Sequence, residues 1–119
     1  MAQKNGDFLI QYYAPSKKFQ LGAYQSGGVW NGGPLSVTSP VIGKWYRIDW
    51  TWNQTNGKSN LYINKILEST TTITNKGIST NQLTIGNKAS GSDRALNGSV
   101  NNFKIRNYAM TTLQIQNDN

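Results

Sequence analysis

The stretch Gly43-Lys44-Trp45-Tyr46-Arg47-Ile48-Asp49-Trp50-Thr51-Trp52-Asn53 decides the fold class, together with Ser59-Asn60-Leu61-Tyr62-Ile63-Asn64 after a polar Asn-Gly turn. In the first run one parity holds Tyr46, Ile48, Trp50 and Trp52, and the other holds Arg47, Asp49 and Thr51. Side chains of a strand point alternately to its two faces, so this pattern gives one apolar face. A helix would not produce it. The two runs predict an antiparallel hairpin in which Leu61 and Ile63 oppose Tyr62 and Asn64.

Further strand signals flank this hairpin. Residues 7–14 and 18–25 predict a second hairpin, in which Phe19, Leu21 and Ala23 oppose a polar face that includes Tyr24. Residues 35–41 predict another strand, bounded by Pro40 and Gly43. A helix is expected only over residues 109–116. Many strands at short spacings favour a β-sandwich.

These motifs also carry a family resemblance. Trp45-x-x-Ile48 and the strand Leu61-Tyr62-Ile63-Asn64 resemble the core of a laminin-G-like, concanavalin A-like jelly roll. Leu83-Thr84-Ile85-Gly86 resembles the next strand of that family, residues 96–105 its closing strand and residues 109–115 its short final turn. The resemblance implies an all-β antiparallel β-sandwich over residues 1–119, a single domain and a module of a larger protein, with at most one short C-terminal helical turn.

Domains of the resembling family usually have additional strands before the position that corresponds to the first residue of this chain. If those strands are absent, an exposed sheet edge needs a cover, so we expect pairing with flanking chain or with a second copy. Lys65 stands where a glycine often occurs in the family, and Asn101 and Asn102 replace the usual acidic residues. These departures weaken the transfer of a metal site or of a specific ligand.

Composition excludes several kinds of chemistry. The chain of 119 residues has no His or Cys, so a His-dependent triad, a thiol nucleophile and a His/Cys zinc site are ruled out. Glycoside hydrolysis commonly needs two carboxyl groups flanking the bond, and the acids Asp7, Asp49, Glu68, Asp93 and Asp118 form no close pair in sequence. The sequence therefore predicts no enzyme and no catalytic residues. It also has no run of about 18 apolar residues, so no membrane span is predicted.

No cofactor is expected, and calcium is the one metal left open. Its oxygen ligands can come from Asn and carbonyl groups as well as from carboxylates, and Asp93, Asn101 and Asn102 are the residues that could contribute. The few carboxylates and the nearby Lys88 and Arg94 argue against strong affinity, so no metal-ligating residue is assigned.

Carbohydrate binding agrees best with the residues that remain. Trp30 and Asn31 lie between Gly-rich turns, Tyr24 falls on the polar face of its strand, and polar loops contain Asn53, Asp93 and Arg94. Aromatic rings can stack on sugar faces while amide and charged groups bond the hydroxyls. These six residues are the predicted ligand-binding set, with core packing as the alternative for Trp30. Trp45, Trp50 and Trp52 are expected in the core.

The first interpretation is thus a non-catalytic carbohydrate-binding or adhesion module that recognises a glycan or cell-wall polysaccharide. Such a module would suit an extracellular setting: a cell surface, or a virion such as a phage tail. The alternative is a structural or protein-binding sandwich without a glycan ligand. The net charge of +7 divides into +4 for residues 1–60 and +3 for residues 61–119. This even spread argues against nucleic acid, whose footprint usually clusters on one face.

Overall fold

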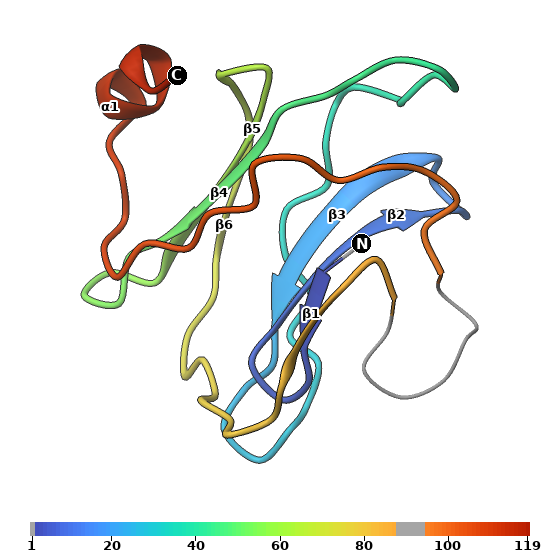
Figure 1. Cartoon of the computed structure of the whole chain (residues 1–119). Helices are drawn as coiled ribbons and strands as arrows, with labels where there is room; N and C mark the ends of the chain where they lie inside the picture. Colours follow the sequence, from blue (N-terminus) through green and yellow to red (C-terminus); the bar gives the residue numbers. More distant parts are fainter. Residues whose placement is uncertain (1, 88–94) are drawn as a thin grey trace.

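The computed structural model describes residues 2–87 and 95–119. Within them, two antiparallel sheets and one helix form (Figure 1). The first sheet has the order β3-β2-β1-β7, with β1 at Ala2–Lys4, β2 at Phe8–Tyr13, β3 at Lys18–Ala23 and β7 at Leu83–Ile85. The second has the order β4-β5-β6, with β4 at Ile48–Trp52, β5 at Lys58–Ile63 and β6 at Ile66–Thr72. The expected antiparallel β-sandwich is confirmed.

Both predicted hairpins are present, and their faces follow the predicted parity. Strand β2 pairs with β3 from Phe8↔Ala23 to Tyr13↔Lys18, and β4 pairs with β5 from Ile48↔Ile63 to Trp52↔Ser59. The apolar faces of the two hairpins meet between the sheets. There the buried cluster consists of Phe19, Leu21, Leu61 and Ile63, with Ile10, Tyr46, Ile48 and Trp50 packed against it.

Ring contacts join the two sheets across this core. Phe8 on β2 lies 5.8 Å from Trp50 on β4, centroid to centroid, and Phe19 on β3 lies 5.5 Å from Tyr46. Such tilted and edge-on pairs add to the free energy gained from burial alone. The prediction of Trp50 as a core residue is therefore confirmed. Trp45, which was expected in the core, is 69% exposed, and that prediction is wrong.

The helix α1, Thr112–Asn117, lies against the outer face of the second sheet beside Tyr62. Tyr62 points to the opposite face from Leu61 and Ile63, yet it is buried. Its hydroxyl shares a hydrogen bond of 3.1 Å with Thr112 Oγ1 at the start of the helix, and Ile115 of the same helix is fully buried. Thr111 begins the helix with a capping box, in which the Thr111 and Gln114 side chains bond each other's backbone N–H. No helix in the described ranges is long and apolar enough to cross a membrane.

Two predicted strands do not form. Over residues 35–41, the backbone N–H groups of Val37 and Thr38 donate to the Glu68 carboxylate, at 2.8 and 2.9 Å, instead of to a neighbouring strand. Because Ser36 N of the same segment donates to Phe19 O on β3, the segment connects the edge of β3 to Glu68 on β6. Residues 96–105 are exposed coil apart from Leu96, and Asn102 has a left-handed φ of 53°, which interrupts an extended run.

Strands β1 and β6 were not predicted. Strand β1 has only three residues and no usable alternation, but it lies between β2 and β7 and pairs with both. Strand β6 follows a two-residue turn at Asn64 and Lys65, whose φ values of 51° and 70° match a type I′ hairpin. A Lys in the second position conceals this turn, because glycine is the usual residue there.

Candidate functional site

An aromatic pair lies on the outer face of the first sheet. Trp30 and Tyr24 stand edge to face, with ring centroids 5.1 Å apart, and their backbones form an isolated antiparallel bridge. Trp30 is 37% exposed, so part of its ring surface remains open to solvent. An exposed indole beside a second ring is a surface on which the apolar face of a sugar could stack.

Local sequence places the Trp30 ring here. The chain turns at Gly27 and Gly28, which both have positive φ. It then runs back beside β3, where Ala23 N donates to Gly32 O at 3.1 Å. The ring then covers Gly22. A β-carbon on residue 22 would lie 2.5 Å from Trp30 Cη2 and 2.2 Å from Gly32 O, so only glycine fits.

The segment that carries the ring pair also offers polar groups. Within residues 2–87 and 95–119, neither the indole N–H of Trp30 nor the side-chain amide of Asn31 has a hydrogen-bond partner. The Tyr24 hydroxyl accepts from Gln3 Nε2 at 3.1 Å, which fixes its ring. Among the described residues, the indole N–H of Trp30 and the side-chain amide of Asn31 therefore have no protein partner that would compete with the hydroxyl groups of a ligand.

The structure brings together only part of the predicted ligand-binding set. Tyr24, Trp30 and Asn31 are neighbours on the first sheet. Asn53 belongs to the turn between β4 and β5 in the second sheet, where its Oδ1 accepts from Thr55 N at 2.9 Å. Its role there is to hold a turn, and no described contact joins it to the aromatic pair. Asp93 and Arg94 lie outside the described residues.

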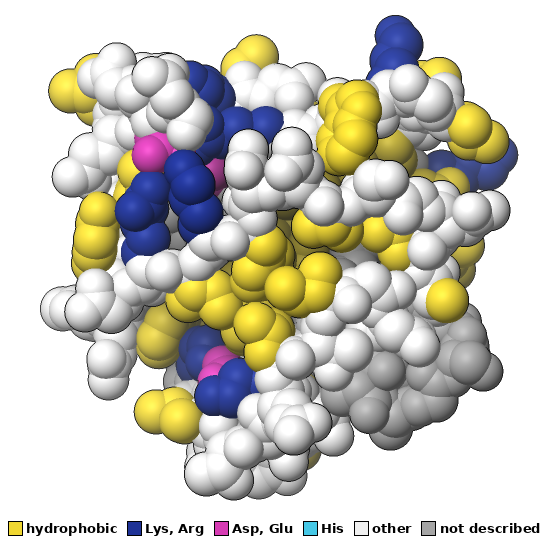
Figure 2. All heavy atoms as spheres, in the orientation of Figure 1, with side chains coloured by type: hydrophobic (Ala, Val, Ile, Leu, Met, Phe, Trp, Pro, Cys, Tyr) yellow, Lys and Arg dark blue, Asp and Glu magenta, His cyan; other side chains and the backbone are white. Residues whose placement is uncertain are grey.

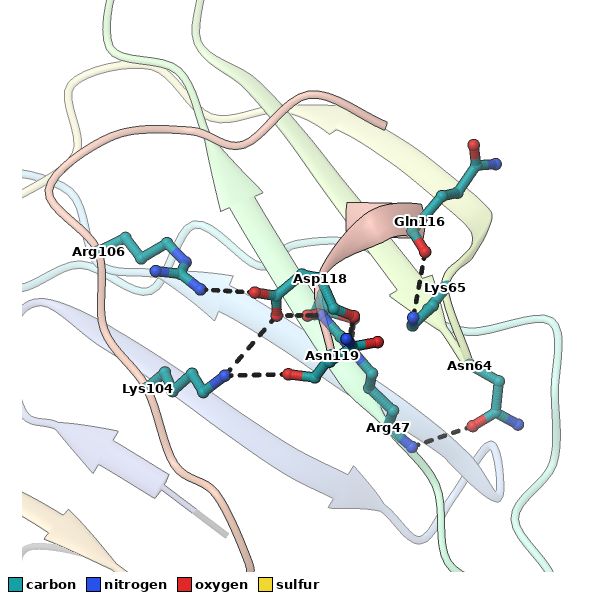
Figure 3. A network of polar contacts seen from close by, with 9 residues as sticks. Arg47, Asn64, Lys65, Lys104, Arg106, Gln116, Asp118 and Asn119 are labelled. Atoms are coloured by element: carbon teal, nitrogen blue, oxygen red, sulfur yellow. Dashed lines mark hydrogen bonds and ion pairs between the residues drawn. The ribbon is translucent and has the colours of Figure 1, made fainter. Parts of the chain in front are cut away.

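A second polar cluster lies beside the second sheet and was not predicted as a site. Arg47 donates to Asp49 through Nε and Nη2, at 2.8 and 2.9 Å, and through the same Nη2 to Asp118 Oδ2 at 2.9 Å (Figure 3). Arg106 Nη2 donates to Asp118 Oδ1 at 2.9 Å. Arg47 and Asp49 share the outward parity of their run. That parity was the only signal in the sequence, because Asp118 is 71 residues away from Arg47.

Charge pairing sets the protonation of this cluster. The hydrogen bond to Asp49 raises the pKa of Arg47 above its already high ordinary value. Desolvation by itself would raise the pKa of Asp118, but the Arg47 hydrogen bond and the charges of Lys104, Arg106 and Arg47 outweigh it and lower that pKa. A general acid for glycoside hydrolysis needs a raised pKa, so Asp118 is unsuited to that role.

An open hollow of about 420 Å³ adjoins the cluster, between residues 106–110 and α1. Its lining combines a ring, aliphatic groups and polar groups from Arg106, Tyr108, Met110, Leu113, Asn117 and Asp118. The hollow is shallow and open to solvent, so it would contact one side of a ligand and leave the other side in water.

No set of three acidic side chains that could hold a metal occurs among the described residues. Asn101 and Asn102, the other residues considered for calcium, are both exposed in the segment after residue 95. Because Asp93 is outside the described residues, calcium binding stays a prediction from the sequence alone.

Comparisons with known proteins bear on the fold. The family model described as the concanavalin A-like lectin/glucanases superfamily matches residues 1–116. A crystal structure of an S-layer domain-containing protein from Clostridium thermocellum is similar, with 18% sequence identity and a TM-score of 0.48. That match covers 83% of this chain and 50% of the crystallised chain, which holds residues 221–444 of that protein, so this chain spans about half the length of that fragment. No curated protein has a significant match to the sequence.

Proposed function

Because the chain belongs to the concanavalin A-like lectin/glucanase superfamily, we propose that it is a non-catalytic module that binds a polysaccharide through Trp30 and Tyr24. The observation that carries this proposal is the exposed ring pair with its centroids 5.1 Å apart. Asn31 and the indole N–H of Trp30 would bond sugar hydroxyls. The setting we propose is extracellular, on a cell surface or a virion, where polysaccharides are available as ligands.

The ring pair has features that simple core packing does not require. A Trp that only filled the interior would bury its ring and satisfy its N–H. Trp30 instead keeps 37% of its surface exposed, although Gly22 lets its ring lie directly on the sheet backbone. Docking against backbone restricts the ring, so less conformational entropy would be lost when a ligand stacks on it.

The test is binding of the purified protein to a panel of glycans and cell-wall polysaccharides at physiological salt. Trp30→Ala should abolish saturable binding of uncharged polysaccharides. Trp45→Ala is the matched control, because it removes an even more exposed Trp from the loop before β4. Loss in Trp30→Ala alone supports the proposal. Equal binding by wild type and Trp30→Ala contradicts it, as does the absence of any ligand in the panel.

A second candidate function is self-association or pairing with another chain, as a structural module. It is favoured by exposed apolar side chains, among them Ile42, Trp45, Val100 and Ile105. Figure 2 shows apolar side chains at the surface on one face of the molecule. Light scattering tests self-association, because it compares the mass in solution with the 13.2 kDa of a single chain. A mass that rises with concentration supports a structural role, and a constant monomer mass excludes self-association.

A further inference from the structure

Three cationic side chains from distant parts of the chain converge on one carboxylate. Arg47 comes from the run that leads into β4, and Lys104 and Arg106 come from the segment that crosses in front of the sandwich (Figures 1 and 3). Asp118 Oδ2 accepts from Arg47 at 2.9 Å and lies 3.8 Å from Lys104 Nζ. Asp118 Oδ1 accepts from Arg106 at 2.9 Å. Each oxygen of the carboxylate thus has its own arginine.

Asp118 compensates charges that the remaining acids cannot. Asp49 already occupies the Nε edge of Arg47, with contacts of 2.8 and 2.9 Å. If the Asp118 side chain turned away, Arg47, Lys104 and Arg106 would face Asp49 as the one remaining carboxylate of the cluster. Figure 2 shows basic side chains gathered on this part of the surface. The carboxylate of a ligand could therefore take the place of the Asp118 carboxylate, and the number of negative charges facing these three cations would stay the same.

Two features make such a replacement feasible. Asp118 follows the helix in an extended conformation, with φ −77° and ψ 129°, so its side chain can leave without unwinding α1. Its side chain is also 21% exposed, so a competing group can approach from solvent. The helix itself is held independently by Ile115 and by its capping box.

The hollow beside Asp118 suggests what the carboxylate would be attached to. Tyr108 and Leu113 offer apolar surface, while Asn117 offers an amide, and Arg106 lines both the hollow and the carboxylate site. This mixture suits a sugar ring, which has an apolar face and a rim of hydroxyl groups. A ring in the hollow would place an attached carboxylate next to Arg106.

We propose that Arg47, Lys104 and Arg106 form a binding site for the carboxylate of a uronic acid, which Asp118 occupies as an internal competitor when no ligand is bound. The ligand class is an acidic polysaccharide that contains uronate units. This site is separate from the Trp30 surface and does not depend on it.

The probe is polygalacturonate, compared with its fully methyl-esterified form, which keeps the sugar chain but has no free carboxylates. Asp118→Asn should raise the affinity for polygalacturonate about three- to tenfold, because it weakens the internal competitor. The affinity for the esterified polymer should not change. A thermal melt of each variant confirms that it is folded at the assay temperature. Equal affinity of wild type and Asp118→Asn for polygalacturonate would overturn the proposal.

Positively charged proteins bind polyanions without a specific site, so charge-matched variants are needed. In the Asp118→Asn background, Arg106→Gln should cost about three- to tenfold in affinity, and Lys44→Gln, which removes an exposed charge elsewhere, should cost much less. Equal losses would indicate general attraction and would contradict the proposal. Poly-glutamate should bind at least about threefold more weakly than polygalacturonate. Equal binding of the two would assign the site to acidic peptides instead of sugars.

Side-chain NMR gives a readout that a structural role alone would not move. Adding trigalacturonate should shift the Nε–H signals of Arg47 and Arg106, and unchanged signals at saturation would exclude the site. Trp30→Ala should leave the gain in Asp118→Asn intact. The failure of this proposal is thus distinguishable from the failure of the Trp30 surface.

Discussion

The indole ring of Trp30 covers Gly22 so closely that a β-carbon on residue 22 would come within 2.5 Å of ring atom Cη2. The two residues belong to neighbouring backbone segments, since residues 29–36 return along the edge of β3. The position of the proposed sugar-binding ring thus depends on the absence of a side chain in β3.

Gly22→Ala should therefore displace both the Trp30 ring and the backbone of Gly32. We expect a loss of about 1–3 kcal/mol in the free energy of unfolding, as for other overpacked sites. Urea unfolding measures this loss. Gly98→Ala is the control, because among the described residues its β-carbon would meet only Leu96, at ordinary contact distances of 3.6 and 3.7 Å, and it should have little effect. Equal stability of Gly22→Ala and wild type would show that Trp30 does not rest on Gly22.

Docking of α1 depends on one fully buried side chain, Ile115. Ile115→Ala should lower the free energy of unfolding by about 2–4 kcal/mol, since it opens a cavity over the second sheet. Leu113→Ala, in the same helix but 66% exposed, should cost far less. Chemical denaturation of the two variants makes the comparison. Similar losses would mean that the helix does not pack through Ile115.

The N-cap of α1 gives a smaller effect. Thr111→Ala removes the hydroxyl that accepts from Gln114 N at 3.2 Å, so one N–H at the start of the helix loses its partner. We expect a cost of about 1 kcal/mol in unfolding free energy. Thr111→Ser keeps the hydroxyl and should recover most of it. If Ser and Ala are equally destabilising, the cap is not the reason.

The turn between β5 and β6 holds a removable strain. Lys65 has a φ of 70°, a conformation that costs a residue with a β-carbon about 1 kcal/mol. Lys65→Gly should raise the free energy of unfolding by about 0.5–1 kcal/mol. Lys65→Ala loses the same contact from Lys65 Nζ to Gln116 O but keeps the strain, so it should not be stabilising. A Gly variant no more stable than the Ala variant would contradict this account.

The lowered pKa of Asp118 makes its contribution dependent on pH. The Asp118 carboxylate is harder to protonate in the folded protein than in the unfolded chain, where its pKa has the ordinary value of 3.8. The stabilisation is therefore fully present above that pH and is lost as the pH falls through the lowered value. The melting temperatures of wild type and Asp118→Asn should differ by a constant amount between pH 5 and 8 and converge below about pH 4. A difference that persists unchanged at pH 2 would rule this out.

Local patterns in the sequence were sufficient for the two hairpins and their faces. Alternation in residues 46–52 placed Trp50 in the core and Arg47 on the outside, as the structure has them. The Gly-rich turns around Trp30 indicated a Trp outside strand pairing, but its backbone forms a bridge with Tyr24, and its role in binding stays a prediction. The strands expected at residues 35–41, from their bounding Pro40 and Gly43, and at residues 96–105, from the family resemblance, did not form, because of the hydrogen bonds to Glu68 and the left-handed φ of Asn102.

The sequence by itself determined the class of the fold and the two hairpins, because these follow from periodicity within a few residues. Tertiary structure alone decided the rest. Strand β1 acquires its central place by pairing with β7, about 80 residues away. Arg47 meets Asp118 across 71 residues. Such pairings depend on how the sheets and the helix pack, and no local pattern encodes them.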